Sequence, residues 1–288
     1  MDLFTPVVPP ERQHPNFRAL VAKGLECERD VLRTWADGFM DRDGKFVTEF
    51  QTTFNWSFWE LYLCAAFREL GFTLDFTHPA PDFCATRHGL TFAAEAAIAS
   101  NADGFAAEWE ADPGEELSAE RKRAMLEYAS IRLANAFDGK LRKYRASYSR
   151  LRHVASKPFI ICLAPFEQPF SYVFAERAMR RLLYAFDMPL YLDDEETGRR
   201  VILGDSAAER VWKSSGAEIE FGLFTDGRAA EVSAVIYSSV ATFGKVQALG
   251  LGGGGVGRPT CLPESACCHS SRPEDVLAPR HRHPPRLR

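Results

Sequence analysis

The chain has 288 residues, of which 46% are hydrophobic and 12% aromatic, and this is enough apolar material for one elaborated domain or two small ones. Its formal net charge of -4 and pI near 6.0 argue against a protein that coats nucleic acid indiscriminately, although a local basic face is compatible with that total. The first four cysteines have apolar neighbours typical of reduced thiols, and the sequence shows neither a signal peptide nor a long apolar window, so we expect a cytoplasmic protein that does not enter a membrane.

The first part of the chain predicts a leader followed by helices. Residues 1–14 contain three prolines in a polar context, which indicates a surface leader, and a helix is predicted over 15–39. We therefore expect an N-terminal leader and helix over 1–44 and a single domain over 45–248. The first element of that domain, TTFNWSFWELYLCAAFRELG, predicts a helix that ends at Gly71 and is apolar nearly all the way round, as buried helices are.

Three strand-like runs follow, with the sequences FTLDF, PDFCATRHG and LTFAAEAAIAS. Turn residues separate them, so they predict an antiparallel meander with His88 and Gly89 as a two-residue turn between the second and third strands. The stretch DPGEELSAER predicts a long helix that begins near Asp112 and Pro113 and runs to about Tyr148. The run KPFIICLAPF predicts a strand that closes this unit.

The remaining sequence predicts a helix, two hairpins and a tail. The helix spans about 171–186, the first hairpin is MPLYLDDEETGRRVILG, and the second is AEIEFGLFTDGRAAEVSAVIYSS; both hairpins are expected to extend or cover the sheet. These elements predict an α/β fold with a mixed central sheet flanked by helices. Residues 249–288 contain no aromatic residue and predict a disordered tail. The tail contains possible zinc ligands, but their spacing matches no compact zinc site: Cys261, Cys267, Cys268 and His269.

Asp82 and Glu95 are the first candidates for chemistry. If Arg87 and Leu90 flank the two-residue turn, antiparallel register places Asp82 opposite Glu95, with both carboxylates on one face of the sheet. Opposed carboxylates repel each other unless a cation lies between them, and carboxylate oxygens are suitable ligands for Mg²⁺ or Mn²⁺. The alternative is that Asp82 is a turn residue and Glu95 a solvated strand residue.

Charged residues on two helices are further candidates. Glu60 falls inside the apolar face of its helix, where solitary acids are rare. In the long second helix, Lys140 flanks the apolar stripe, whereas Lys143 points about 60° farther out, so Lys140 is the better candidate for an ammonium group that reaches inward. The alternatives are a structural Glu60 bonded to backbone or arginine, and a Lys140 that extends to solvent.

The order of these residues resembles the PD-(D/E)XK nuclease superfamily. A helix bearing Glu60, then PDF with Asp82, then a strand with EAA at Glu95, then a helix and a further strand match that pattern over roughly 45–170. The pattern has a lysine where this chain has Ala97, but members are known in which the lysine has migrated to the neighbouring helix. Lys140 would be that migrated lysine.

The resemblance implies a restriction-endonuclease-like core and metal-dependent hydrolysis of phosphodiesters. It implies that Asp82 and Glu95 bind Mg²⁺ or Mn²⁺, that Glu60 orients a water or supports a second metal position, and that Lys140 stabilises the attacking hydroxide or the phosphate charge. The alternative is a noncatalytic module that binds nucleic acid or protein on the same fold, and Ala97 favours it.

The charge distribution predicts a nucleic-acid partner, DNA more than RNA. Between residues 118 and 157 there are eleven Lys or Arg and three acids, in a chain whose total charge is negative. Tyrosines alternate with these cations in KLRKYRASYSRLRH, a mixture suited to phosphate contacts and base stacking. We expect Lys143, Arg145 and Arg150 to bind nucleic acid; the alternative is a solvated helix whose tyrosines belong to the core.

Overall fold

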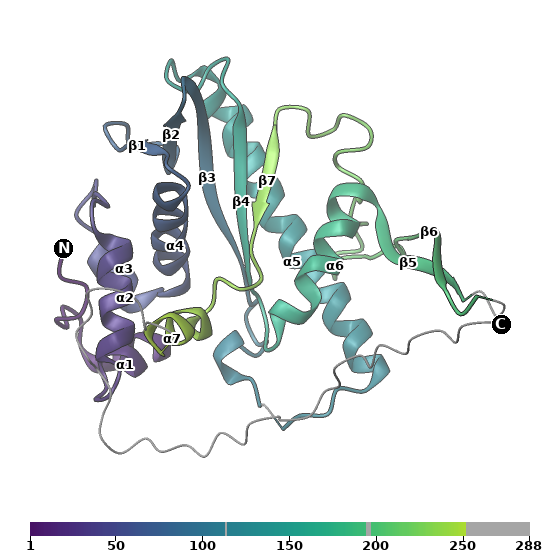
Figure 1. Ribbon diagram of the computed structural model, residues 1–288, viewed down its shortest axis with the longest axis horizontal. Coiled ribbons are helices and arrows are strands. Elements are labelled where there is room, and N and C mark those ends of the chain that lie inside the picture. The colour runs from purple at the N-terminus through teal and green to yellow at the C-terminus, as the bar shows by residue number, and fades with distance from the viewer. Residues whose placement is uncertain (113, 194–196, 252–288) are drawn as a thin grey trace, which may run out of the picture. The chain divides into compact units, whose positions relative to one another are not determined.

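A mixed five-stranded sheet is the centre of the described part of the molecule, residues 1–112, 114–193 and 197–251 of this computed structural model (Figure 1). The strand order is β1-β2-β3-β4-β7, with bounds Thr73–Asp75, Phe83–Arg87, Leu90–Ser100, Phe159–Phe166 and Ala234–Tyr237. The first three strands pair antiparallel, whereas β3, β4 and β7 pair parallel. The predicted α/β fold with a mixed sheet flanked by helices is confirmed.

The turn between β2 and β3 determines the register of the meander. His88 and Gly89 both have positive φ, 48° and 79°, as a two-residue hairpin turn of the primed type requires. Arg87 therefore pairs with Leu90, and the ladder continues to the pair Phe83 and Ala94. The predicted meander and its two-residue turn are confirmed.

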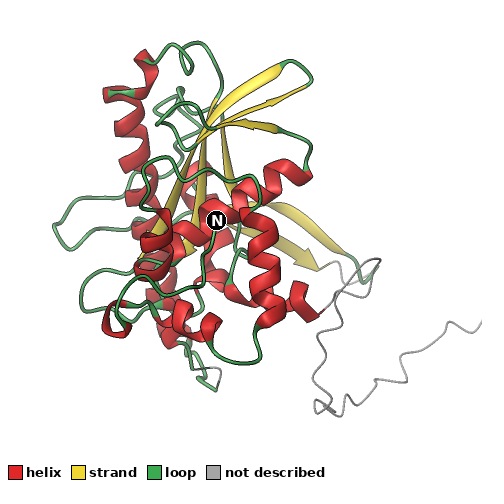
Figure 2. Ribbon diagram, turned by 90° about the vertical axis from the view of Figure 1, so that its left-hand side faces the viewer, coloured by secondary structure: helices red, strands yellow, loops and turns green. Residues whose placement is uncertain are grey.

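Helices cover both faces of the sheet (Figures 1 and 2). On one side lie α1 to α4, with bounds Pro15–Val21, Glu26–Ala36, Phe46–Thr52 and Asn55–Glu69. On the other side lie α5, Ala119–Ala146, and α6, Ser171–Tyr184, while α7, Phe243–Leu251, packs against α2. Single 3-10 turns occur at Pro10–Arg12, Glu108–Glu110 and Tyr148–Arg150.

Small residues in β3 allow helices to approach both faces of this strand. Ala94 and Ala96 belong to the apolar cluster that includes α4, whereas Ala93 and Ala97 belong to the cluster that includes α5. This alternation follows from the two-residue period of a strand. Glu95 shares the face of Ala93 and Ala97, so it faces α5.

The N-terminal predictions were wrong in two respects. Residues 1–14 are not a surface leader, because Leu3 and Phe4 are buried and the side-chain amide of Gln51 donates to the carbonyls of Leu3 and Thr5, at 3.3 and 2.9 Å. The helix predicted over 15–39 is two helices, since the chain turns at Gly24 with φ +90°. A polar sequence with prolines did not reveal the two apolar side chains that fix it to the core.

The start of α5 also differs from the prediction. The helix begins at Ala119 and not at Asp112, because the Ser118 side chain accepts a 3.1 Å hydrogen bond from the backbone N–H of Arg121 and so caps the first turn.

Ser118→Ala is expected to lower the free energy of unfolding by about 1 kcal/mol, since one N–H of the first turn loses its acceptor. Chemical denaturation measures this change. Ser118→Asp, which preserves an acceptor, should stay near the wild-type value, and an unchanged alanine variant would show that the cap contributes nothing.

The C-terminal elements were predicted in part. The predicted helix is α6, and the first predicted hairpin is β5, Phe186–Asp193, with β6, Arg200–Ala207; this pair forms a separate two-stranded sheet and does not extend the central one. The second hairpin was wrong, because only its last part forms a strand, β7, and β7 pairs parallel with β4.

The first part of that segment covers the end of α6. Backbone N–H groups of Gly222, Leu223 and Phe224 donate to the carbonyls of Arg181, Leu182 and Leu183. Carbonyls in the last turn of a helix have no partner within the helix, so a passing chain segment can satisfy them. Because these backbone groups bond to α6, the segment does not form the strand that its alternating sequence predicted.

Two further predictions concern membranes and the tail. In the described residues, no helix is long and apolar enough to cross a membrane. The disordered tail predicted over 249–288 was wrong at its start, because residues 249–251 are the end of α7. The rest of this segment, with Cys261, Cys267, Cys268 and His269, lies outside the described residues.

Candidate active site

The candidate site lies where β2 separates from β3. The β2 ladder ends at the pair Phe83 and Ala94, so the next residues, Asp82 and Glu95, meet through their side chains. The Asp82 backbone N–H donates to Oε2 of Glu95 at 3.3 Å, and Oδ2 of Asp82 accepts from the backbone N–H of Ala96 at 2.7 Å. The sequence-derived register therefore brings the two carboxylates together, with Glu95 fully buried.

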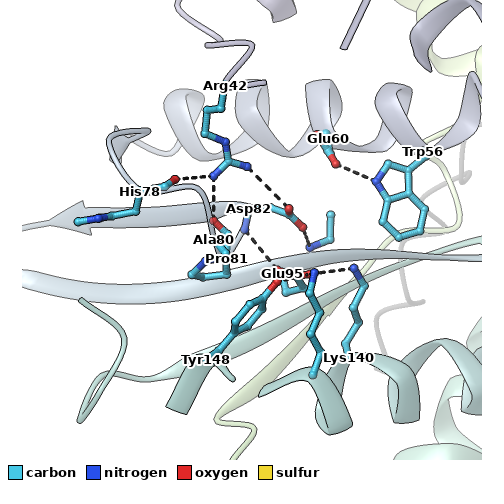
Figure 3. A network of polar contacts seen from close by, with 12 residues as sticks. Arg42, Trp56, Glu60, His78, Ala80, Pro81, Asp82, Glu95, Lys140 and Tyr148 are labelled. Atoms are coloured by element: carbon cyan, nitrogen blue, oxygen red, sulfur yellow. Dashed lines mark hydrogen bonds and ion pairs between the residues drawn. The ribbon is translucent and has the colours of Figure 1, made fainter. Parts of the chain in front are cut away.

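Arg42 holds the loop that carries Asp82 (Figure 3). One guanidinium nitrogen, Nη1, donates to the carbonyl of His78 at 2.8 Å and to that of Pro81 at 3.1 Å, while Nη2 lies 3.8 Å from Oδ1 of Asp82. Arg42 thus fixes the loop between β1 and β2 and places a positive charge beside Asp82.

Two ammonium groups and a phenol converge on one oxygen of Glu95. Nζ of Lys140 and Nζ of Lys143 each donate to Oε1 at 2.9 Å, and the hydroxyl of Tyr148 donates to the same atom at 3.1 Å. These donors come from α5 and the turn after it, which face Glu95. Lys143, which was expected to point about 60° farther out than Lys140, nevertheless reaches the same carboxylate, because a lysine one turn from Lys140 is long enough to do so.

The two lysines differ in their exposure to solvent. The Lys140 side chain is 12% exposed and that of Lys143 is 51% exposed. Lys140 also lies 4.6 Å from the ring centroid of Trp56, which suits a cation–π contact. Lys140 is therefore held on two sides, whereas Lys143 is partly solvated.

Glu60 joins this group through Trp56. The indole N–H of Trp56 donates to Oε1 of Glu60 at 2.8 Å, and both residues come from α4, across β3 from α5 (Figure 3). One region thus holds the side chains of Glu60, Asp82, Glu95 and Lys140. Among the described residues, Glu60 forms no direct hydrogen bond with Asp82 or Glu95.

The three acids respond differently to this environment. Burial, reinforced by the charge of Asp82, raises the pKa of Glu60 to about 8. Burial and the charge of Glu95 raise the pKa of Asp82 to about 6. Burial also opposes ionisation of Glu95, but the charges and hydrogen bonds of Lys140 and Lys143 outweigh it and lower the pKa of this residue. Glu95 is therefore the acid most firmly held as a carboxylate.

Two of the donors around Glu95, Lys143 and Tyr148, hold their protons more firmly than usual. Burial disfavours the charge of Lys143, but hydrogen bonds and charge interactions with Tyr148 and Glu95 raise its pKa. Burial and the charge of Glu95 raise the pKa of Tyr148 to about 12. The phenol is thus a hydrogen-bond donor at neutral pH.

The raised pKa of Glu60 predicts that the free energy of unfolding falls as the pH rises from acidic to neutral values. The folded protein retains a proton on Glu60 that the unfolded chain releases at its ordinary value, so stability falls as the pH rises from 4.5 to about 8. Glu60→Gln cannot ionise, so over this range its free energy of unfolding should rise relative to that of the wild type by several kcal/mol, at most about 5 kcal/mol at roughly 1.4 kcal/mol for each unit of the pKa shift.

Denaturant unfolding at a series of pH values measures this difference. Two other acids with a pKa raised to about 7, Glu108 and Glu167, affect both proteins and cancel in the comparison. The matched control is Glu69→Gln at the exposed end of α4. Parallel curves for Glu60→Gln and the wild type would contradict the raised pKa.

A divalent cation fits the donor set around Asp82 and Glu95. Oδ1 of Asp82 accepts no hydrogen bond from the described residues, and Oε2 of Glu95 accepts only the 3.3 Å bond from Asp82. Mg²⁺ commonly binds one or two carboxylates and keeps several waters, so these two oxygens suit it. Within the described ranges, no group of three or more His, Cys, Asp or Glu side chains has the arrangement of a metal site.

The residues expected to bind nucleic acid are placed differently from one another. Lys143 contacts Glu95, and Arg145 forms hydrogen bonds with Glu231 at 2.8 and 3.0 Å. Arg150 is exposed, and its side chain has no hydrogen bond or ion pair with another described residue. Tyr148 is buried, so base stacking was the wrong role for it and the alternative, a core tyrosine, is the correct one.

Sequence reasoning missed Arg42, Trp56 and the hydroxyl of Tyr148 as parts of the site. Trp56 could have been found, because it precedes Glu60 by four residues and shares its helical face. Arg42 lies in a loop with no pattern that connects it to Asp82. Only the packing of distant segments places it there.

Comparisons of the chain with protein-family models, curated proteins and solved structures found no match.

Proposed function

We propose that the protein hydrolyses phosphodiester bonds of nucleic acid with Mg²⁺ or Mn²⁺, on a restriction-endonuclease-like core. The observation that carries the proposal is that Asp82 lies beside Glu95 at the end of the β2–β3 ladder and that the ammonium group of Lys140 donates a hydrogen bond to Glu95. Paired carboxylates with an adjacent ammonium group are what metal-assisted attack on a phosphodiester requires.

Asp82 and Glu95 would hold the cation through the two oxygens that have few protein partners. When bound, a cation of this kind lowers the pKa of a coordinated water and makes hydroxide available at neutral pH. Lys140 places a positive charge beside Glu95. This charge would stabilise the negative charge that develops on the phosphate during attack. Lys143 adds a second charge, and Glu60 retains a proton that it can donate or share with a water.

DNA is the preferred substrate in this proposal. Arg150 and Arg152 are exposed directly after α5, near the turn that carries Tyr148, and can contact phosphates on the approach to the site. Arg145 is less suited to this role because Glu231 already neutralises it. The buried thiols of Cys64, Cys84 and Cys162 form no disulfide, which supports a reducing compartment such as the cytoplasm.

A noncatalytic binding module is the second candidate. The observation in its favour is that Oε1 of Glu95 already accepts from Lys140, Lys143 and Tyr148, so the acid is neutralised by the protein itself. Such a cluster can serve to hold α5 against the sheet. The two candidates differ in whether bound nucleic acid is cut.

Incubation of the full chain with single- and double-stranded DNA and RNA, with Mg²⁺, Mn²⁺ or a chelator, tests the proposal. Cleavage that needs the metal supports it. Binding with a steep salt dependence but no cleavage supports the binding module instead, and neither binding nor cleavage would refute both. Arg150→Ala should lower the slope of log affinity against log salt by about one, with Arg12→Ala, on the N-terminal turn, as the control.

A further inference from the structure

A second residue besides Arg42 holds the loop between β1 and β2. Nε2 of His153 lies 2.6 Å from the carbonyl oxygen of Ala80, which precedes Asp82 by two residues. A carbonyl oxygen can only accept a hydrogen bond, so this imidazole nitrogen carries a proton and is the donor. His153 belongs to the segment after α5, 73 positions later in the chain than Ala80, so the contact joins two distant parts of the molecule.

The ring of His153 is held in place by a second imidazole. The rings of His78 and His153 are stacked, with their centroids 3.7 Å apart and their planes 4° apart. Nε2 of His78 in turn lies 3.8 Å from Oδ2 of Asp75, at the end of β1. Because a stacked ring cannot turn about its Cβ–Cγ bond without losing this contact, the stack keeps Nε2 of His153 directed at the carbonyl of Ala80.

Three successive backbone groups of the loop are anchored by side chains. They are the carbonyl of Ala80, the carbonyl of Pro81 and the N–H of Asp82, and the contacts of the last two are drawn in Figure 3. Their partners are, in that order, His153, Arg42 and Glu95. The ring of Pro81 fixes its φ angle, so few backbone rotations remain free between the first anchor and the carboxylate of Asp82.

The loop has little apolar burial that could replace these anchors. Thr77 and Pro79 are exposed and Ala80 is half-buried, and Pro81 is the only buried residue of the stretch 77–82. An exposed loop keeps its conformational freedom unless specific contacts order it. Without the hydrogen bond from His153, we therefore expect the carboxylate of Asp82 to sample a wider range of positions.

The segment that carries His153 also contacts the second carboxylate. The hydroxyl of Tyr148, five residues earlier, donates to Oε1 of Glu95 at 3.1 Å. Residues 148–153 therefore hold Glu95 directly and hold Asp82 through the backbone of Ala80. One short segment thus fixes the two acids relative to each other.

We propose that His153 is a positioning residue for the metal site of Asp82 and Glu95, a role that rests on the proposed function. It keeps Asp82 beside Glu95 before a cation binds, so that the cation does not have to order the loop. The imidazole itself is not a ligand in this role. Groups that orient metal ligands without touching the metal commonly change the affinity by about 10- to 100-fold.

Binding of Mn²⁺ to the full chain, followed by the paramagnetic signal of the free ion, tests this role without cleavage. Asp82→Asn should lose the site and so identifies the binding that belongs to it. His153→Phe retains a ring that can stack on His78 but has no donor, and its dissociation constant for Mn²⁺ should be higher by about tenfold or more. His153→Gln retains an N–H that can reach the carbonyl of Ala80, so it should stay within about threefold of the wild type.

His88→Asn is the matched control. His88 is an exposed imidazole in the turn at the other end of β2, and asparagine tolerates the positive φ of this position, so the affinity for Mn²⁺ should not change. Circular dichroism establishes that each variant is folded. If His153→Phe does not fold, His153→Asn makes the same comparison, because its shorter amide does not reach the carbonyl of Ala80.

The affinities for Mn²⁺ decide the role. Equal affinity of the wild type and a folded His153→Phe protein would overturn it, and so would a His153→Gln protein as weak as His153→Phe, because the imidazole and not its N–H would then matter. A wild type without a site that Asp82→Asn removes would overturn both this role and the proposed function. If the wild type binds Mn²⁺ at Asp82 but cuts no nucleic acid, the proposed function fails alone, and the His153 variants still decide the role.

Discussion

Glu95→Gln is expected to lower metal-supported cleavage by three or more powers of ten, which corresponds to about 4 kcal/mol of transition-state stabilisation. The substitution keeps the shape and the hydrogen-bond acceptor that face Lys140 and Tyr148, but it removes the negative charge that would hold the cation. Because Glu95 is fully buried and does not reach the phosphate backbone from the surface, affinity for nucleic acid should stay nearly unchanged.

Single-turnover cleavage and equilibrium binding, measured on the same preparation, separate the two effects. Glu69→Gln at the exposed end of α4 is the matched control and should retain full activity. Circular dichroism must show a folded variant, because the substitution leaves Lys140 and Lys143 without their shared counter-ion. A folded Glu95→Gln protein that cuts at the wild-type rate would refute the assignment of Glu95 as a metal ligand.

Lys140→Ala is the second large expected effect, with a loss of about two powers of ten in the cleavage rate, or close to 3 kcal/mol. Lys140 is nearly buried between Glu95 and Trp56, so its charge acts in a medium where water screens it little. Lys143→Ala should cost no more than about one power of ten, since half of its side chain is exposed and its charge is screened.

The double variant tests whether the two lysines act on the same group. Both ammonium groups donate to Oε1 of Glu95, so their effects should be non-additive: the remaining lysine can compensate in part for the one removed. Lys122→Ala, on the exposed first turn of α5, controls for a general loss of positive charge. A larger loss in Lys143→Ala than in Lys140→Ala would contradict the ranking by burial.

The sequence by itself determined the meander and the proximity of Asp82 to Glu95. Both depend on local interactions: a two-residue turn at His88 and Gly89 fixes the register, and the two-residue period of a strand then decides which side chains meet. The helix that carries Glu60 was equally local, because its apolar composition and Gly71 define its extent to within a few residues.

Only the tertiary structure decided which groups surround those carboxylates. Lys140, Lys143 and Tyr148 reach Glu95 because α5 packs on the face of β3 that carries Ala97, and this packing depends on residues more than forty positions away in the chain. A helical wheel gives the direction of the Lys143 side chain about the axis of its helix. It gives neither the distance from the helix to the sheet nor the reach of a lysine side chain.

The parallel pairing of β7 with β4 and the contacts of the N-terminal residues also depend on segments that are distant in the sequence. The segment before β7 alternates like a hairpin strand, yet its backbone groups bond to the end of α6, and β7 pairs with β4. Leu3, likewise, is buried in the apolar core, and the side-chain amide of Gln51, 48 residues later, donates to its carbonyl. Long-range pairing and burial are set by the sum of contacts that become available when distant segments meet, and no local pattern in the sequence encodes that sum.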